Sequence, residues 1–335
     1  MPAADEEAGR FQAYPYFPQA DWFWTPIPAA PVLDADSATW VTDLADPGEV
    51  HSCAIIEFGA ALRGPGGPSG DPVTAATPRF DVVFRQQNGG GGDDWGGDPF
   101  TASMPWPADL VVPGITSPGT TPPEDPPYNG DVVVADPTTG QVFCLWRAED
   151  NGATKNAWWG RQASLYGDGR EPGTDHEGAS TGSRLSRYAT VIQAAEMTSA
   201  FDAGCAAIPH ALAFFTDMAA AEVRYPASIG DGDNEAGVAL PIPQGARVQL
   251  DPSIDVDAIV GITTWERIIA KTLQQYGAYC MGNGGARMGF QFEYLGDASP
   301  EIDPYTDVYA GIFDYFDMVN IPWSGLRVLA SWDGS

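Results

Sequence analysis

The sequence is poor in positive charge. Of its 335 residues, 16 are lysine or arginine and 45 are acidic, which gives a formal net charge of -29, and the only lysines are Lys155 and Lys271. A field of this sign repels phosphate backbones and anionic lipid headgroups. We therefore expect neither nucleic acid nor a membrane surface as a partner.

Long hydrophobic runs are also absent. No stretch of about 20 apolar residues occurs, so we expect no membrane span. The first residues, MPAADEEAGRFQAYPYFPQ, lack the basic start and the apolar core of a signal peptide. We expect an extracellular protein whose signal peptide is absent from this sequence, on the basis of the resemblance described below.

Cysteine is scarce and widely spaced. The four cysteines show no CxxC pair and no histidine at zinc-finger spacing, so a structural zinc site is not expected; they are Cys53, Cys144, Cys205 and Cys280. Two disulfides and buried free thiols both agree with this spacing.

Glycine, proline and hydrophobic residues are plentiful. There are 39 glycines and 30 prolines, and 44% of the residues are hydrophobic. This composition predicts a large core built from short elements joined by turns and long ordered loops. We expect a mainly β fold, a jelly-roll-like β-sandwich with one or two short helices. Residues 1–35, rich in proline and aromatics, are expected to form an extended strap packed on a single β-rich domain of residues 36–335.

Three stretches carry clear local signals. Residues 131–148 read as two strands around a turn from Asp136 to Gly140. Residues 264–276 predict a helix, because Thr263 and Glu266 have capping-box spacing and Gly277 supplies a stop. The apolar stretches on either side of residues 283–285 predict a second hairpin.

Several blocks of the chain resemble a group of proteins. The blocks are IPHALAF, ALPIPQGARVQLDP and LQQYGAYCMGNGG, together with the hairpin NGDVVVADPTTGQVFCLWRAED. In order and spacing they resemble an uncharacterised group of secreted proteins from high-GC bacteria, over roughly residues 127–285. The resemblance implies an extracellular protein that acts on polysaccharides. The matching polar residues are His210, Arg247, Gln249, Asp251 and Tyr279.

The chain departs from that pattern at Gly282, where the group has Asp before Asn-Gly-Gly. A catalytic role for that Asp would put activity of this chain in doubt. A role in shaping the turn is one that glycine also fills.

His210 lies in an apolar run, where an imidazole needs a partner. It is either a satisfied core residue or part of a cavity, and we expect it at the floor of a cleft. Asp131, Asp231 and Asp251, at the ends of neighbouring strands, are candidates for the paired carboxyls of a glycoside hydrolase, although capping the Asp-Pro turn is an alternative role for Asp251. Arg247 and Tyr279, with His210, would suit a polysaccharide lyase, which removes the proton α to a uronate carboxyl.

Tryptophans in irregular segments are candidates for sugar binding, because CH groups of a pyranose stack on aromatic faces. The expected substrate-binding residues are Trp22, Trp24, Trp158 and Trp159, with Trp95 as a further candidate.

Acidic loops offer a candidate site for a structural calcium ion. Asp231, Asp233 and Glu235 stand at alternate positions, as in loops that bind hard cations, although an exposed acidic turn has the same pattern. A weaker set is Asp168, Asp175, His176 and Glu177. No other cofactor is expected.

These observations predict a secreted protein that acts on a polysaccharide or oligosaccharide, most directly as a glycoside hydrolase with paired carboxylates. The alternatives are a lyase with a His or Tyr base, and a non-catalytic carbohydrate-binding or self-assembling extracellular protein. The acidic charge favours neutral glycans over polyuronates.

Overall fold

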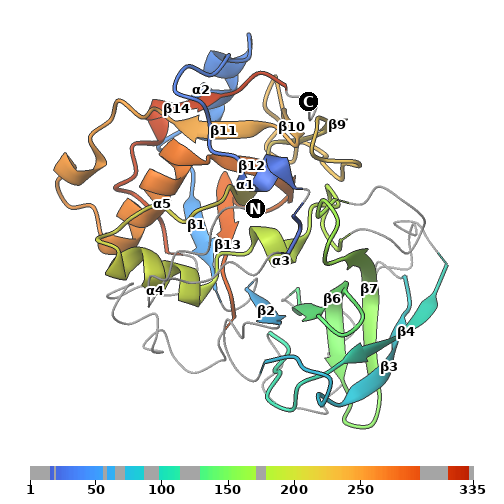
Figure 1. The fold of residues 1–335 in the computed structure, drawn as a ribbon. Coiled ribbons are helices and arrows are strands. Elements are labelled where there is room, and N and C mark those ends of the chain that lie inside the picture. The colour runs from blue at the N-terminus through green and yellow to red at the C-terminus, as the bar shows by residue number, and fades with distance from the viewer. Residues whose placement is uncertain are drawn as a thin grey trace.

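The computed structural model describes residues 16–18, 20–55, 59–64, 72–86, 98–113, 129–170, 179–294 and 316–331. Strands account for 33% of the structure and helices for 17%, which confirms the mainly β fold class. The strands form two six-stranded sheets and one two-stranded sheet (Figure 1). Within the described ranges, no helix is both long and apolar enough to cross a membrane.

The first sheet has the strand order β1-β13-β8-β12-β11-β14. Its strands are β1 (His51–Ala54), β8 (Leu212–Thr216), β11 (Arg247–Leu250), β12 (Ala278–Asn283), β13 (Met288–Gln291) and β14 (Leu326–Val328). β8 pairs in parallel with β12 and antiparallel with β13, so the sheet is mixed.

The second sheet has the order β2-β5-β6-β7-β3-β4. Its strands are β2 (Ala60–Arg63), β3 (Arg79–Phe84), β4 (Phe100–Pro105), β5 (Asp131–Asp136), β6 (Gln141–Asp150) and β7 (Lys155–Ser164). The pairs β2–β5 and β3–β7 are parallel and the others are antiparallel. Both large sheets therefore contain parallel pairs beside the antiparallel ones that a jelly roll uses.

The longer helices cover the first sheet (Figure 1). Trp40 of α2, Met197 of α4 and Ile269 of α5 share one apolar cluster with residues of its strands. The bounds of these helices are Ser37–Leu44, Ala194–Asp202 and Thr264–Gln275. The remaining elements are α1 (Asp21–Trp24), α3 (Arg187–Thr190), the 3-10 turns η1 (Val256–Ala258) and η2 (Trp323–Gly325), and the two-stranded sheet of β9 (Ala219–Val223) and β10 (Ile242–Gln244).

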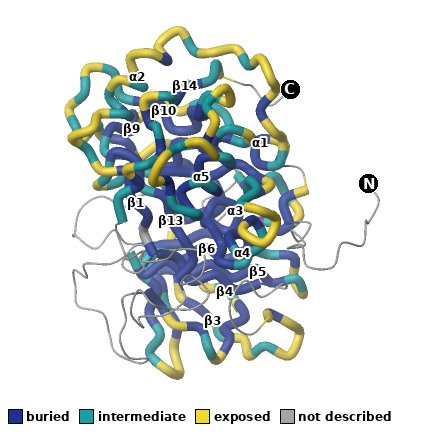
Figure 2. Tube along the Cα trace, turned by 90° about the vertical axis from the view of Figure 1, so that its left-hand side faces the viewer, coloured by how far each residue is buried: buried dark blue, intermediate teal, exposed yellow. Residues whose placement is uncertain are grey.

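The two large sheets meet where the chain leaves β13. The Ala60 N–H donates to the Phe292 carbonyl at 3.0 Å, and the Tyr294 N–H donates to the Ala60 carbonyl at 2.8 Å. An apolar cluster that includes Val133 of the second sheet and Ala213 of the first continues the contact. Buried backbone accordingly runs from one sheet to the other (Figure 2).

The expected helix at residues 264–276 is confirmed as α5. Thr263 Oγ1 accepts from the Glu266 N–H, and Glu266 Oε2 accepts from the Thr263 N–H at 2.9 Å, so both halves of the capping box are present. Gly277 ends the helix with a φ of 71°, in the left-handed region that favours glycine.

One of the two expected hairpins forms. β5 and β6 pair antiparallel on either side of the turn, as expected. The prediction of a second hairpin around residues 283–285 is wrong, because β8 lies between β12 and β13 and pairs with both. The glycine-rich link carries the chain past the end of β8, where the Gly284 N–H donates to the Thr216 carbonyl at 3.2 Å.

The cysteines form no disulfide. Cys53, Cys144 and Cys280 are buried and Cys205 is half-buried, and none of the four is joined to another cysteine. Burial raises the pKa of Cys144 to about 11 and raises that of Cys280 as well, so these two thiols stay protonated at neutral pH.

Asp136 fixes the β5–β6 turn. Its carboxylate accepts from the Thr138 N–H at 2.9 Å, from Thr139 Oγ1 at 2.7 Å and from Arg79 Nη1 at 2.7 Å. Burial alone would raise the pKa of Asp136, but these hydrogen bonds outweigh it and the pKa lies below its usual value. The stabilisation is therefore present above the unfolded-state pKa of about 4 and is lost as the pH falls through the folded-state value.

We predict that Asp136→Asn lowers the free energy of unfolding at neutral pH by about 1–3 kcal/mol, because charged hydrogen bonds are lost. Urea unfolding of both proteins at neutral pH and at about pH 3 measures this. The difference between them should shrink in acid, and an equal difference at both pH values would contradict the assignment.

Candidate functional site

A cleft of about 1200 Å³ lies between the two large sheets. We call it the intersheet cleft. The first sheet contributes residues of β1, β8, β12 and β13, and the second contributes residues of β6 and β7. Residues outside these strands add to the lining, among them 180–182, 229–231 and 284–286. The residues that matter most for its chemistry are Trp146, Trp159, Arg187, Phe215, Asp231, Asn283, Phe290 and Gln291.

Two tryptophans form the wall on the second sheet. Trp146 of β6 and Trp159 of β7 are cross-strand partners, and both line the cleft. The Arg147 guanidinium lies 4.5 Å from the ring centre of Trp146, and the Arg161 guanidinium lies 4.8 Å from that of Trp159. Trp159 is buried and Trp146 is half-buried, so the aromatic surface open to the cleft belongs mainly to Trp146.

Asp231 and Asn283 form a polar corner of the cleft. Asp231 Oδ1 accepts from Gln244 Nε2 at 2.6 Å and from the Asn283 N–H at 3.0 Å. Asn283 Nδ2 donates to Asp233 Oδ1 at 2.9 Å. The backbone of Gly182 packs so tightly here that a Cβ at that position would lie 2.1 Å from Asp231 Cγ.

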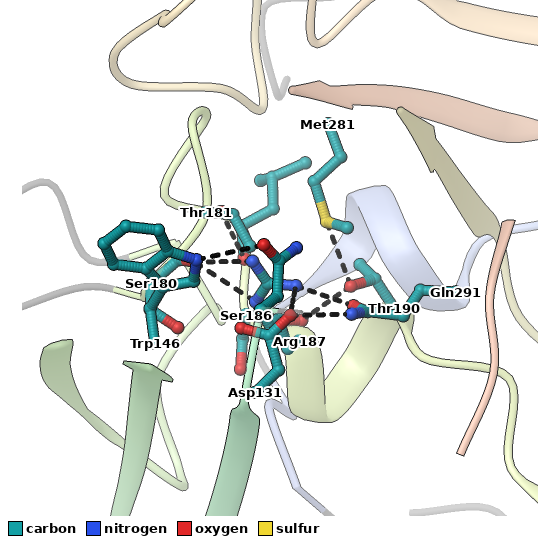
Figure 3. A network of polar contacts seen from close by, with 11 residues as sticks. Asp131, Trp146, Ser180, Thr181, Ser186, Arg187, Thr190, Met281 and Gln291 are labelled. Atoms are coloured by element: carbon teal, nitrogen blue, oxygen red, sulfur yellow. Dashed lines mark hydrogen bonds and ion pairs between the residues drawn. The ribbon is translucent and has the colours of Figure 1, made fainter. Parts of the chain in front are cut away.

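A buried charged network lies behind the cleft (Figure 3). Arg187 Nη1 donates to Asp131 Oδ2 and to Gln291 Oε1, both at 2.8 Å, and Gln291 Nε2 donates to the same Asp131 oxygen at 2.9 Å. Arg187 Nε and Nη2 donate to the Ser180 carbonyl at 3.1 and 2.9 Å. Burial raises the pKa of Asp131, while Arg187 and Gln291 act in the opposite direction. Asp131 is thus a partner of Arg187 rather than part of the cleft lining.

The expected place of His210 at the floor of a cleft is wrong. Its side chain is 1% exposed and stacks on Phe23, with ring centres 4.3 Å apart. Its Nε2 lies 2.8 Å from Glu196 Oε1, and its Nδ1 lies 2.9 Å from the Ala211 carbonyl oxygen. Its ring is satisfied inside the core, since the N-terminal aromatic residues cover the surface that the strand alone would expose.

Arg247 and Tyr279 line a separate pocket of about 420 Å³ beside residues 25–32. Arg247 donates to the carbonyls of Tyr276 and Thr25, and the Tyr279 hydroxyl donates to the Trp22 carbonyl at 2.8 Å. Burial raises the pKa of Tyr279 to about 12, so its hydroxyl remains protonated at neutral pH. Both side chains attach the N-terminal segment to the first sheet.

Asp251 caps a turn. Its Oδ1 accepts from the Ser253 N–H at 2.8 Å, and hydrogen bonding to Ser253 lowers the pKa of the carboxyl. It does not line the intersheet cleft. The structure therefore separates His210, Asp251 and the pair of Arg247 and Tyr279.

Of the four expected sugar-binding tryptophans, Trp159 lines the cleft. Trp22 is fully buried, and its indole N–H donates a hydrogen bond to the Asp168 carbonyl. The indole N–H of Trp24 donates to the Phe17 carbonyl. Trp158 donates to Glu149 Oε1 at 2.8 Å and is absent from the lining. Trp95 lies outside the described residues.

The acidic loop is held by amides. Asp231 and Asp233 accept from Asn283 as described above, and Glu235 is exposed. Across the part of the chain that the structure describes, no group of three His, Cys, Asp or Glu side chains is placed to hold a metal ion. Asp168 accepts from the Arg170 N–H, and residues 175–177 lie outside the described ranges. Calcium binding stays a prediction.

Trp146, Arg187 and Asn283 were missed by the sequence analysis. A register count across the β6–β7 hairpin would have placed Trp146 opposite Trp159. No local pattern marks Arg187, whose partners stand 56 and 104 positions away in the sequence.

No family model, curated protein or solved structure matches this chain. The resemblance to a group of secreted proteins therefore remains a prediction. Gly282, where that group has Asp, lies beside the polar corner: a Cβ there would lie 3.6 Å from Asp231 Oδ1 and 3.1 Å from the Phe215 ring. An Asp at this position would bring a second carboxylate next to Asp231.

We predict that Asp131→Ala and Arg187→Met each destabilise the protein by about 3–5 kcal/mol, because each leaves the other charge buried without its partner. The double variant should lose clearly less than the sum of the two losses. Urea unfolding of the four proteins measures the coupling, and additive losses would show that the pair is not an energetic unit.

Proposed function

We propose that this protein is an extracellular carbohydrate-binding protein whose intersheet cleft holds a polysaccharide or oligosaccharide chain. The observation that carries the proposal is the tryptophan wall of Trp146 and Trp159, which lines the same cleft as the polar corner of Asp231 and Asn283. Sugar rings combine apolar CH faces with hydroxyl rims, so they need this combination of flat aromatic surface and side-chain amides or carboxylates.

The size of the cleft agrees with a ligand of several sugar units. Its volume of about 1200 Å³ exceeds the roughly 300–1000 Å³ of typical small-molecule sites. The acidic surface also agrees with an uncharged or cationic glycan, since a polyuronate would be repelled by the net charge of -29.

We predict that Trp146→Ala weakens oligosaccharide binding by about tenfold or more, because the sugar loses a stacking face. Trp158→Ala is the matched control: Arg147 also lies against Trp158, at 4.9 Å from its ring centre, but Trp158 does not line the cleft. Isothermal titration calorimetry against a panel of neutral oligosaccharides measures both variants.

The control variant should bind like the wild type. Equal weakening in the two variants would assign the effect to the loss of Arg147 packing. Failure of the wild-type protein to bind any member of the panel would contradict the proposal.

Glycoside hydrolysis is the second candidate. It requires two carboxyl groups on either side of the scissile bond. The observation in its favour is that Asp231 and Asp233 are both held by Asn283 at the polar corner. A lyase has less support, because the described lining of the cleft contains no histidine, tyrosine or lysine to act as its base.

For the hydrolase we predict that the wild type releases reducing ends without ultraviolet-absorbing products. Asp231→Asn and Asp233→Asn should each reduce the rate by about a hundredfold, the effect expected when an acid or base is removed. Glycan binding without release of reducing ends would leave the binding function and reject hydrolysis.

A further inference from the structure

The charged side chains that line the intersheet cleft differ in how far other groups of the protein compensate their charge. Among the described residues that line it, two carry charged side chains, Arg187 and Asp231. Which of them remains electrostatically uncompensated decides what kind of sugar the cleft favours.

The charge of Arg187 is compensated within the protein. Its ion pair with Asp131 is buried, with side-chain exposures of 5% and 0%. Its N–H groups donate to Asp131, Gln291 and the Ser180 carbonyl, and its guanidinium lies 5.5 Å from the ring centre of Phe215. Arg187 is therefore poorly placed to bind an anionic ligand.

Asp231 has no such compensation. Its hydrogen-bond donors are the neutral Gln244 amide and the Asn283 N–H, and no lysine, arginine or histidine in the described part of the chain forms an ion pair with it. The negative charge of the cleft is thus concentrated at the polar corner.

Two oxygen atoms of residues that line the cleft lack a hydrogen-bond partner within the described part of the protein. Ser180 is 5% exposed and its Oγ is buried, and the Oδ1 of Asn283 is buried as well. Neither atom has a hydrogen-bond partner among the described residues. Both atoms have almost no accessible surface, so a ligand donor reaches them only if the lining shifts, and the direct contact of a bound cation is with Asp231.

A protonated amine fits these features better than a hydroxyl or an acetamide does. An ammonium group carries a positive charge and three N–H donors, and it has no acceptor that would repel the surrounding oxygens. The tryptophan faces nearby add cation–π attraction.

Building on the proposed carbohydrate-binding function, we propose that the intersheet cleft selects glycans with free amino groups, such as glucosamine units, and that Asp231 is the residue that recognises the ammonium.

The test compares two tetrasaccharides by isothermal titration calorimetry with the full chain: a β-1,4 tetramer of glucosamine and its N-acetylated counterpart. We expect the wild type to bind the amine form at least about tenfold more tightly, the effect of one charge-assisted hydrogen bond. The preference should decline when the pH is raised enough to deprotonate the sugar amine. It should also weaken with salt, because Asp231 is exposed to solvent.

Asp231→Asn should abolish the preference, so that the variant binds the two tetramers with equal affinity. Glu235→Gln is the matched control, since it removes one negative charge from the same loop but lies outside the described lining. Thermal unfolding of both variants verifies that they are folded.

The outcomes separate the two proposals. Equal affinity of the wild type for both tetramers would overturn the amine preference and leave carbohydrate binding intact. Loss of the preference in both variants would assign it to the general acidic field rather than to Asp231, which also overturns the inference. Binding of neither tetramer, nor of any neutral oligosaccharide, would reject the carbohydrate-binding function together with the inference.

Discussion

The buried pair of Asp131 and Arg187 is the interaction on which the arrangement of the molecule depends. Asp131 belongs to β5 of the second sheet, Arg187 to α3, and their shared partner Gln291 to β13 of the first sheet. Two opposite charges without access to water must keep their geometry, because separating them would leave each one unsolvated. The network thus fixes one sheet against the other, and with it the distance between the tryptophan wall and the polar corner.

This constraint divides the charged groups of the protein into two kinds. Charges that hold the fold are buried and paired, as in Asp131 with Arg187. Asp231 is different, because amides orient it without cancelling its charge. A carboxylate that is held in place and left uncompensated is suited to recognising a donor from outside. The general acidity of the surface strengthens that effect.

The sequence predicted what local chemistry determines. The capping box of Thr263 and Glu266 and the turn at Asp136 are read from neighbouring residues, and both are present. The insertion of β8 between β12 and β13 was not predicted, because a glycine-rich link resembles a hairpin turn whether or not a third strand enters. The cleft was not predicted either, because local patterns do not show which distant segments meet. Its residues come from distant segments, and the burial of His210 depends on Phe23, which no local pattern places over it.

The strand order also determines when the cleft can exist. β1 and β13 pair residue by residue, His51 with Met288, although they lie towards opposite ends of the chain. Pairing two distant segments costs the conformational entropy of closing a long loop before any favourable contact forms. Such pairings are therefore slow to form during folding. Because Phe290 and Gln291 belong to β13, a molecule in which this strand has not paired with the rest of the first sheet lacks one wall of the cleft, and ligand binding therefore reports on this long-range pairing.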